Sequence, residues 1–170
     1  SDVCSSDLLN PFGYSSPSGT AYTTSSYGGS MYFNGSSDYL TVSGSWNLSS
    51  TGNWSVEAWV YPTNLPAGAY SQIMGGSGFS FGIYDGSISI TNNNVGVLSG
   101  SALKLNTWQH IAVSRNSGST RLFVNGVQVG STYTDSNDFG STNIVSIGKD
   151  SAGTTYITGY MAGIRILKGV

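Results

Sequence analysis

The residues that could carry out acid–base chemistry gather in one segment of the sequence. Residues 106–130 hold the only histidine, His110, together with Trp108 and two of the three arginines, Arg115 and Arg121. A catalytic histidine must be oriented by an acid and must reach a nucleophile, and no acid stands near His110 in the sequence. We therefore expect His110 to be a partly exposed strand residue beside Trp108, and both arginines to be strand-end residues beside a loop.

A second possible chemistry, glycoside hydrolysis, normally needs two carboxyl groups on either side of the scissile bond. Glu57 is the only glutamate of the chain, and no second acid lies two or four residues away, where it would share the same strand face. A cross-strand ion pair with Arg165 is the role that we expect for Glu57. The sequence thus predicts that the protein is not an enzyme and has no catalytic residue.

The composition excludes further classes of function. Charged residues make up 8% of the chain and the net charge is −2, whereas an average soluble protein is about 25% charged. No run of Lys or Arg offers the contacts on which binding to a phosphate backbone depends, so nucleic acid is not an expected partner. No apolar run approaches the roughly 18 residues of a membrane span, and the N-terminus carries no export signal pattern. We expect no membrane insertion.

The first residues are set apart from the rest. Residues 2–8, DVCSSDL, resemble one reading frame of a widely used sequencing-library adapter; the alternative is a Ser-rich tail. In either case a lone cysteine, Cys4, predicts neither a disulfide framework nor a metal site. We expect residues 1–30 to be an adapter-like artefact followed by a flexible linker or edge segment, and residues 31–170 to form the domain.

From Met31 onward the sequence alternates in the manner of short β-strands, and no window supports an amphipathic helix. Asp85-Gly86 and Asn125-Gly126 suit type I′ turns, in which both central residues need positive φ. Folding about the first turn places four apolar residues on one face, Phe81, Ile83, Ile88 and Ile90. Folding about the second pairs Leu122 with Val129. Two independent hairpins therefore predict an all-β sandwich or barrel.

Five further stretches identify a family resemblance. SMYFNGSSDYLTV, WSVEAWVYPTNL, NTWQHIAVSR, TRLFVNGVQVGS and GYMAGIRILKG follow one another in this order across residues 30–169. Together they resemble the laminin-G-like, concanavalin A-like domains. The resemblance implies a jelly roll β-sandwich of two antiparallel sheets. Similar domains commonly continue past the corresponding Lys-Gly, so we expect residues 31–170 to be truncated at the C-terminus.

The resemblance also raises the question of calcium. Similar domains often hold Ca²⁺ at a sheet rim through carboxylates and backbone carbonyls, and many carry an acidic pair in the last strand. Here those positions are Ala162 and Gly163, which leaves Asp38 as the candidate metal ligand. The alternative is that Asp38 caps its own turn. Three other acids are expected to be turn formers, Asp135, Asp138 and Asp150.

The positive evidence for function lies in loops that combine Asn, Ser, Tyr and Trp without charge. Such side chains stack on sugar rings and hydrogen-bond to hydroxyls, although they could also merely solvate turns. The predicted ligand-binding residues are Trp46, Tyr70, Asn92, Asn93, Asn94 and Tyr133. Glu57 and His110 are assigned to strand faces, and we expect neither to contact the ligand.

The sequence therefore predicts a non-catalytic module that binds a glycan or cell-surface ligand. We expect it to lie beside neighbouring domains of a longer extracellular or virion protein, such as a phage tail fibre or a bacterial adhesin. The alternatives are a structural spacer or oligomerisation domain and, less favoured, a relative of glycoside hydrolases or polysaccharide lyases.

Overall fold

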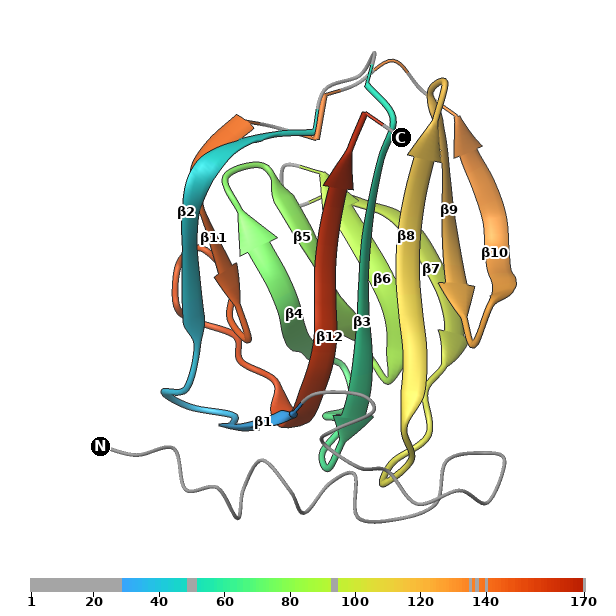
Figure 1. Ribbon diagram of the computed structural model, residues 1–170. Helices are drawn as coiled ribbons and strands as arrows, with labels where there is room; N and C mark the ends of the chain where they lie inside the picture. The colour runs from blue at the N-terminus through green and yellow to red at the C-terminus, as the bar shows by residue number, and fades with distance from the viewer. Residues whose placement is uncertain are drawn as a thin grey trace.

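The computed structural model is a sandwich of two antiparallel β-sheets (Figure 1). It describes residues 29–48, 52–92, 95–134, 136, 138–139 and 141–169. Within these residues there are twelve strands and no helix, so none of the described segments could cross a membrane as a helix. The predicted all-β jelly roll sandwich is confirmed.

Each sheet holds six strands. The front sheet of Figure 1 has the order β1 (Met31–Asn34), β12 (Thr158–Lys168), β3 (Trp54–Pro62), β8 (Gln109–Asn116), β9 (Ser119–Val124) and β10 (Val127–Thr134). The back sheet has the order β2 (Leu40–Asn47), β11 (Ser141–Ile147), β4 (Tyr70–Gly76), β5 (Phe79–Tyr84), β6 (Ser87–Asn92) and β7 (Val95–Ala102). Strands that are distant in sequence, such as β3 and β12, are therefore direct neighbours.

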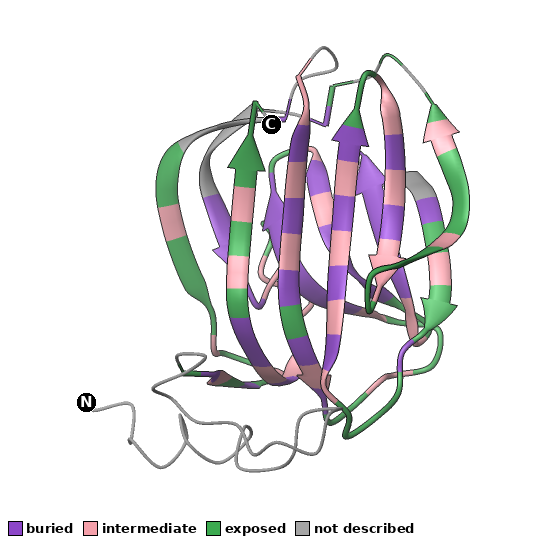
Figure 2. Ribbon diagram, turned by 45° about the vertical axis from the view of Figure 1, so that its right-hand side comes forward, coloured by how far each residue is buried: buried purple, intermediate pink, exposed green. Residues whose placement is uncertain are grey.

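Alternation along the strands separates the core from the two outer faces. In β3, Trp54, Val56, Ala58 and Val60 are buried while the residues between them are less so, a pattern visible along the strands in Figure 2. The inner faces of both sheets meet in one apolar core whose largest members are Phe33, Trp54, Ile73, Met74, Phe81, Ile83, Ile88, Ile90, Ile111, Leu122 and Phe139. Strands such as β3 and β8 thus leave a less buried row of side chains on the outer face, whereas β4 and β6 are buried along nearly their whole length.

The hairpins follow the predicted turn chemistry. Asp85 and Gly86 have φ of 47° and 75°, and Asn125 and Gly126 have 51° and 78°. The predicted partners are found in register, including Ile83 with Ile88 and Leu122 with Val129. The stretch 115–120, expected as a longer loop, also closes through a two-residue turn, because Ser117 and Gly118 adopt φ of 48° and 79°. A third hairpin of the same kind therefore joins β8 to β9.

Arg115 departs from its predicted position. Its side chain is 1% exposed, whereas the sequence predicted a strand-end residue beside a loop. The alternation of β8 points Arg115 to the same side as Ile111 and Val113. Its guanidinium donates to Thr120 Oγ1 at 2.9 Å and lies 5.1 Å from the centre of the Phe139 ring. Arg115 therefore belongs to the core.

The C-terminal segment GIRIL lies within β12, as the sequence predicted. Arg165 to Lys168 pair with Glu57 to Trp54 of β3, and a register shift separates Ala162 from Arg165. Ile164 and Ile166 pack partly buried against the core. The end of the described chain thus covers one flank of β3.

Candidate functional site

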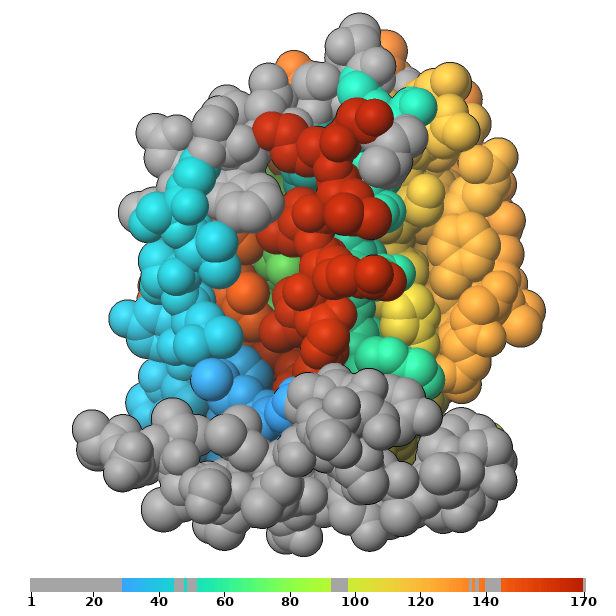
Figure 3. Space-filling view, in the orientation of Figure 1, coloured from blue at the N-terminus to red at the C-terminus, as the bar shows by residue number. Residues whose placement is uncertain are grey.

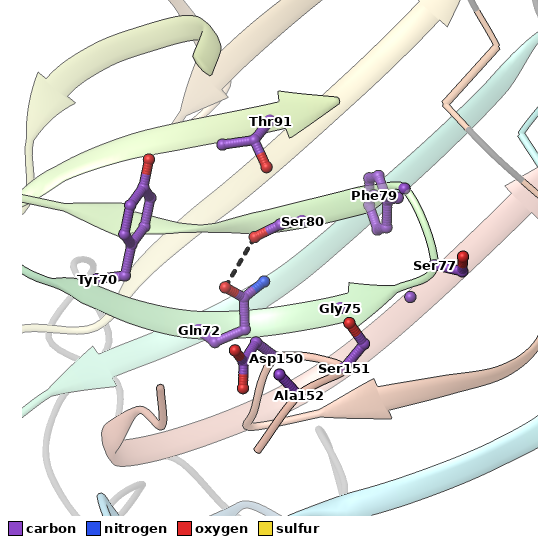
Figure 4. Close-up of a pocket in the computed structure, with 12 residues that line it drawn as sticks. Tyr70, Gln72, Gly75, Ser77, Phe79, Ser80, Thr91, Asp150, Ser151 and Ala152 are labelled. Carbon is purple, nitrogen blue, oxygen red and sulfur yellow. Dashed lines mark hydrogen bonds between the residues drawn. The ribbon is translucent and has the colours of Figure 1, made fainter. Parts of the chain in front are cut away.

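A pocket of about 430 Å³ opens on the outer face of the back sheet (Figure 4). Its lining comes from β4, β5 and β6, from the β4–β5 turn and from the loop after β11. The lining residues are Tyr70, Gln72, Gly75, Gly76, Ser77, Gly78, Phe79, Ser80, Thr91, Asp150, Ser151 and Ala152. Apart from Asp150, all of these side chains are uncharged.

Small residues bring the loop after β11 against the sheet. A Cβ atom at Gly75 would lie 3.0 Å from Asp150 Cα and 3.1 Å from the carbonyl oxygen of Lys149. A Cβ atom at Gly82 would lie 2.7 Å from the carbonyl oxygen of Ser71. Contacts this short leave no room for a side chain. Gly75 therefore allows residues 150–152 to form one wall of the pocket.

Gln72 forms a fixed polar element of the pocket. Its Nε2 donates to the carbonyl oxygens of Met74, at 2.5 Å, and Phe81, at 3.2 Å. Its Oε1 accepts a hydrogen bond from Ser80 Oγ at 2.8 Å, drawn as the dashed line in Figure 4. The register of β4 against β5 shifts between Gln72 and Met74. This bulge holds an amide and a hydroxyl in fixed positions beside the pocket.

Asp150 is the only carboxylate among the lining residues. Its Oδ1 accepts from the backbone N–H groups of Thr154, at 2.7 Å, and Thr155, at 3.1 Å, and its Oδ2 accepts from Thr154 Oγ1 at 2.6 Å. Burial alone would raise the pKa of Asp150, but these hydrogen bonds outweigh burial and hold the pKa below its usual value. The predicted role of Asp150 as a turn former is confirmed, and the pocket carries one fixed negative charge at neutral pH.

The lowered pKa of Asp150 predicts a pH-dependent contribution to stability. Ionised Asp150 stabilises the fold above its unfolded pKa of about 3.9, and this contribution is lost as the pH falls through the lower folded value. Asp150→Asn keeps an oxygen for the same donors but does not titrate. We expect the variant to be less stable than the parent at neutral pH, by less than about 1 kcal/mol because the carboxylate is partly exposed and solvent screens its interactions.

Urea denaturation of both proteins from neutral pH down to about pH 3 measures this difference. The gap between the two free energies of unfolding should close as the pH falls below about 4. A gap of constant size across the range would contradict the role assigned to the ionised carboxylate.

Of the predicted ligand-binding residues, Tyr70 lines the pocket. It is the first residue of β4, and its ring packs on Tyr84 with centroids 4.5 Å apart and planes inclined by 41°. This contact holds the Tyr70 ring at the pocket rim, as Figure 4 shows. Tyr70, predicted in a loop, is thus a strand residue at the rim of a pocket, and ligand binding by Tyr70 stays a prediction.

The predicted placement in loops is wrong for Asn92 and Tyr133. Asn92 lies at the end of β6, is 7% exposed, and donates through Nδ2 to the carbonyl oxygen of Asp138 at 2.7 Å. Tyr133 lies in β10 opposite Thr120 and packs against the core. In both cases the strand extends further than the turn signals indicated. These positions favour structural roles for both side chains.

The remaining predicted ligand-binding residues give less information. The backbone of Trp46 lies in β2, opposite Thr142 of β11. Asn93 and Asn94 lie outside the described residues. Ligand binding by these three residues stays a prediction.

Asp38, the predicted calcium ligand, lies in a loop stabilised by its own hydrogen bonds. Asp38 Oδ2 accepts from the backbone N–H of Asn34 at 3.1 Å, and Asn34 Oδ1 accepts from the N–H groups of Ser36, Ser37 and Asp38. Ca²⁺ takes six to eight oxygen ligands. In the described part of the chain, no group of three His, Cys, Asp or Glu residues is placed to hold a metal. The residues around Asp38 do not fit such a site, and calcium binding stays a prediction.

His110 has no acidic neighbour in the sequence, but the folded sheet places Glu57 beside it. Glu57 pairs with Arg165 through Oε1, which confirms the predicted ion pair, and Glu57 Oε2 lies 3.4 Å from His110 Nε2. The strand register explains this, since Trp59 stands opposite His110 and Glu57 stands opposite Ala112. Sequence neighbours alone could not reveal it, because β3 and β8 are separated by four strands along the chain.

The sequence and the fold both match one family. A model described as the concanavalin A-like lectin/glucanases superfamily matches residues 21–170. The chain belongs to this superfamily. The predicted family resemblance is thereby confirmed. No curated protein sequence matches the chain significantly.

Solved structures share the superfamily fold. Domains LG4-5 of the mouse laminin α1 chain match with a TM-score of 0.59 and 14% identity, covering 79% of this chain and 40% of that one. Domain 4 of a GH43 extracellular arabinanase from Geobacillus stearothermophilus, solved with arabinotriose, matches with a TM-score of 0.58 and 17% identity, covering 86% and 85%. Botulinum neurotoxin type C, whose cell entry depends on interaction with two ganglioside molecules, matches with a TM-score of 0.56 and 16% identity, covering 82% and 38%.

These likenesses concern the fold. The superfamily domain described above spans about two fifths of the laminin and neurotoxin structures, and most of the arabinanase domain. Members of one fold carry different functions in sites grafted onto it. The function of this chain therefore depends on the residues of its own surface.

Proposed function

We propose that this domain is a non-catalytic carbohydrate-binding module whose back-sheet pocket takes a neutral saccharide. The observation that carries the proposal is the combination of the Tyr70 ring at the pocket rim with fixed uncharged polar groups in the same pocket. The buried Gln72 amide fixes the Ser80 hydroxyl through Oε1, Ser80 Oγ keeps acceptor lone pairs for sugar hydroxyls, and the Tyr70 ring offers an apolar face to the sugar ring.

The charge of the pocket favours a neutral ligand. Asp150 is the only carboxylate among the lining residues. Burial raises its pKa, but hydrogen bonds from Thr154 and Thr155 outweigh burial, lower the pKa and keep the group anionic at neutral pH. An anionic carboxylate repels the carboxylates of uronic or sialic acids and accepts hydrogen bonds from hydroxyls. A neutral hexose or pentose therefore suits the pocket better than an acidic sugar.

The same residues argue against hydrolysis. Glycosidases hold two carboxyl groups about 5 to 10 Å apart across the scissile bond. In this pocket Asp150 supplies the only carboxyl group among the lining residues. The oxygens of Asp150 already accept three hydrogen bonds from Thr154 and Thr155. Asp150 is therefore suited to hold the loop and to accept hydroxyl donors, and binding without turnover is the function that these groups support.

Two structural neighbours lend support through their ligands. The arabinanase domain was solved with arabinotriose, a neutral oligosaccharide, whereas the neurotoxin interacts with gangliosides, which supports glycan binding but not the preference for a neutral sugar. Their low identities carry over no residue, and the extracellular or virion location remains part of this proposal. We propose adhesion to a glycan surface as the role of the module within a longer protein.

Substitution of Tyr70 tests the pocket. Tyr70→Ala removes the ring face and should weaken binding to a neutral polysaccharide about tenfold, since aromatic contacts contribute about 0.5 to 1.5 kcal/mol. Tyr70→Phe keeps the ring and should retain most of the affinity. Affinity gel electrophoresis with arabinan as the neutral probe and alginate as the acidic probe measures both effects.

A matched control is Tyr32→Ala, because Tyr32 is an exposed tyrosine of the front sheet. It should leave retardation by arabinan unchanged. Equal retardation of the parent and Tyr70→Ala, with unchanged thermal unfolding, would show that the pocket is not the binding site. Absence of retardation by any neutral polysaccharide would favour the structural-spacer alternative.

A further inference from the structure

A tryptophan is exposed in the middle of the front sheet, where no turn or loop explains it. Trp59 is 38% exposed and lies in β3, which has β12 on one side and β8 on the other. Figure 3 looks onto this outer face, where β12, β3 and β8 lie side by side. Large aromatic side chains are more often buried, so an exposed indole within a strand indicates a candidate contact surface for a ligand.

The two strands beside Trp59 bring a histidine ring to one flank of the indole and a glycine to the other. On the β8 side, the His110 ring packs edge-on, with centroids 5.4 Å apart and planes inclined by 61°. On the β12 side stands Gly163, where a Cβ atom would lie 3.4 Å from Trp59 Cδ1. Gly163 adopts a φ of 55° at the register shift of β12. A glycine at this point therefore leaves a notch beside the indole.

Polar groups border the same ring. Glu57 binds Arg165 through one carboxylate oxygen, and the other oxygen lies 3.4 Å from His110 Nε2. The side chains of Glu57, His110 and Arg165 are 18%, 25% and 66% exposed. A guanidinium carries five donors in a planar fork and a carboxylate accepts about four hydrogen bonds. The Glu57–Arg165 pair thus lies two residues along β3 from Trp59, and His110 stands directly opposite Trp59.

We infer that Trp59, Glu57, His110 and Arg165 form a second saccharide-binding site on the front sheet. A sugar ring stacks on the indole beside Gly163, and its adjacent hydroxyls hydrogen-bond to the Arg165 guanidinium and the Glu57 carboxylate. Glu57 and Arg165 balance each other's charge, so the site suits a neutral sugar. The sequence predicted that Glu57 and His110 lie on strand faces and do not contact a ligand. Their clustering around Trp59 instead supports ligand binding on this face of the sheet.

This site is independent of the back-sheet pocket. Trp59 faces outward from the front sheet and the pocket opens outward from the back sheet, with the core between them. One small sugar cannot reach both. If the proposed function also holds, a single domain binds two chains of a polysaccharide and cross-links them.

Tryptophan fluorescence tests the second site in the Tyr70→Ala background, where the pocket is impaired. The probes are arabinotriose and cellohexaose as neutral ligands and oligoalginate as an acidic one. We expect the neutral probes to change the emission of the protein that keeps Trp59. Isothermal titration calorimetry, which needs no reporter residue, should show about tenfold weaker binding when Trp59→Ala is added. Trp59→Phe should recover part of the affinity because it restores a ring.

A second variant keeps the tryptophan and fills the notch. Gly163→Asn suits a position with positive φ, because asparagine tolerates the left-handed region. It should weaken binding of the neutral probes at least threefold while thermal unfolding stays near that of the parent. Arg165→Lys keeps the charge but removes the planar fork and should also weaken binding.

The outcomes separate the two sites. If the Tyr70→Ala variant binds no probe, while the Trp59→Ala and Gly163→Asn variants keep the affinity of the parent, the second site is overturned and the pocket is the binding site. Loss on Trp59→Ala with no effect of Tyr70→Ala supports the second site and overturns the proposed pocket. No emission change with any probe at millimolar concentration also overturns the second site. Cross-linking of soluble arabinan, followed as turbidity, should require both residues.

Discussion

A chain that lacks residues 164–170 is expected to lose its cooperative unfolding transition. The deletion removes the pairing of β12 with the first half of β3 and strips Ile164 and Ile166 from the core. Truncating a fully buried aliphatic side chain costs about 2 to 5 kcal/mol, so each of these partly buried isoleucines contributes less, while a domain has about 5 to 15 kcal/mol of net stability. The two partial losses add to the loss of the pairing of Arg165–Lys168 with β3 and to the backbone groups left unpaired along β3, and together they are comparable to the whole stability of the domain.

Urea denaturation followed by circular dichroism and by tryptophan emission measures this effect. Trp54 is a sensitive probe, because it is buried and pairs with Lys168 at the strand end that the deletion exposes. The control is removal of residues 1–10, which the sequence places outside the domain and which should change stability by less than about 0.5 kcal/mol. A C-terminal deletion that unfolds at the parent midpoint would show that this half of β12 contributes nothing to the fold.

The hairpins could be predicted because two local signals give the same register. At Asp85-Gly86, the need for positive φ fixes the turn, and the apolar alternation then pairs Ile83 with Ile88. Both signals lie within twelve residues of sequence. The same holds at Asn125-Gly126, and the structure confirms both pairings.

The clusters between distant strands could not be predicted in the same way. His110 meets Glu57 only because β3 pairs with β8, and the register that sets Trp59 opposite His110 is a property of the folded sheet. The notch at Gly163 depends in turn on a register shift within β12. Neighbouring residues in the sequence carry no signal for any of these three relations.

The pocket was partly predictable. Tyr70 follows a loop rich in small residues, and that composition suggested an aromatic contact surface. Gln72 and Thr91 gave no signal, because they lie on strands and their side chains face outward only in the observed register. The wall formed by Asp150 and Ser151 depends on close packing over Gly75, which is a long-range contact. Turn signals also ended β6 and β10 too early, and this misplaced Asn92 and Tyr133.

Arg115 shows which of two conflicting signals decided the fold. Its charge predicted exposure, whereas the alternation of β8 placed it beside Val113 on the inner face. Thr120 supplies an acceptor at 2.9 Å and Phe139 supplies a ring face at 5.1 Å. A buried cation needs such partners, and one of them comes from a distant segment. The strand pattern therefore prevailed, with the tertiary structure supplying the guanidinium with an acceptor and a ring face.

Replacing Arg115 with alanine should destabilise the domain by about 3 kcal/mol or more. The change leaves the buried Thr120 hydroxyl without this donor, which costs about 1 to 3 kcal/mol, and opens a cavity beside Phe139, whose ring packs on Trp54 at 5.3 Å. Arg115→Met fills most of that space without a charge. It should lose less than half as much, because apolar residues often replace buried charges at little cost.

Arg121→Ala is the matched control, since Arg121 is a partly exposed arginine of the same hairpin, opposite Ser114. It should change stability by less than about 1 kcal/mol. Urea midpoints of the three variants rank the effects, and equal midpoints for Arg115→Ala and Arg121→Ala would contradict a core role for Arg115. A methionine variant as unstable as the alanine variant would instead assign the stabilisation to the hydrogen bond and the cation–π contact. A methionine variant near the parent would assign it to packing, because only the filled volume is common to both side chains.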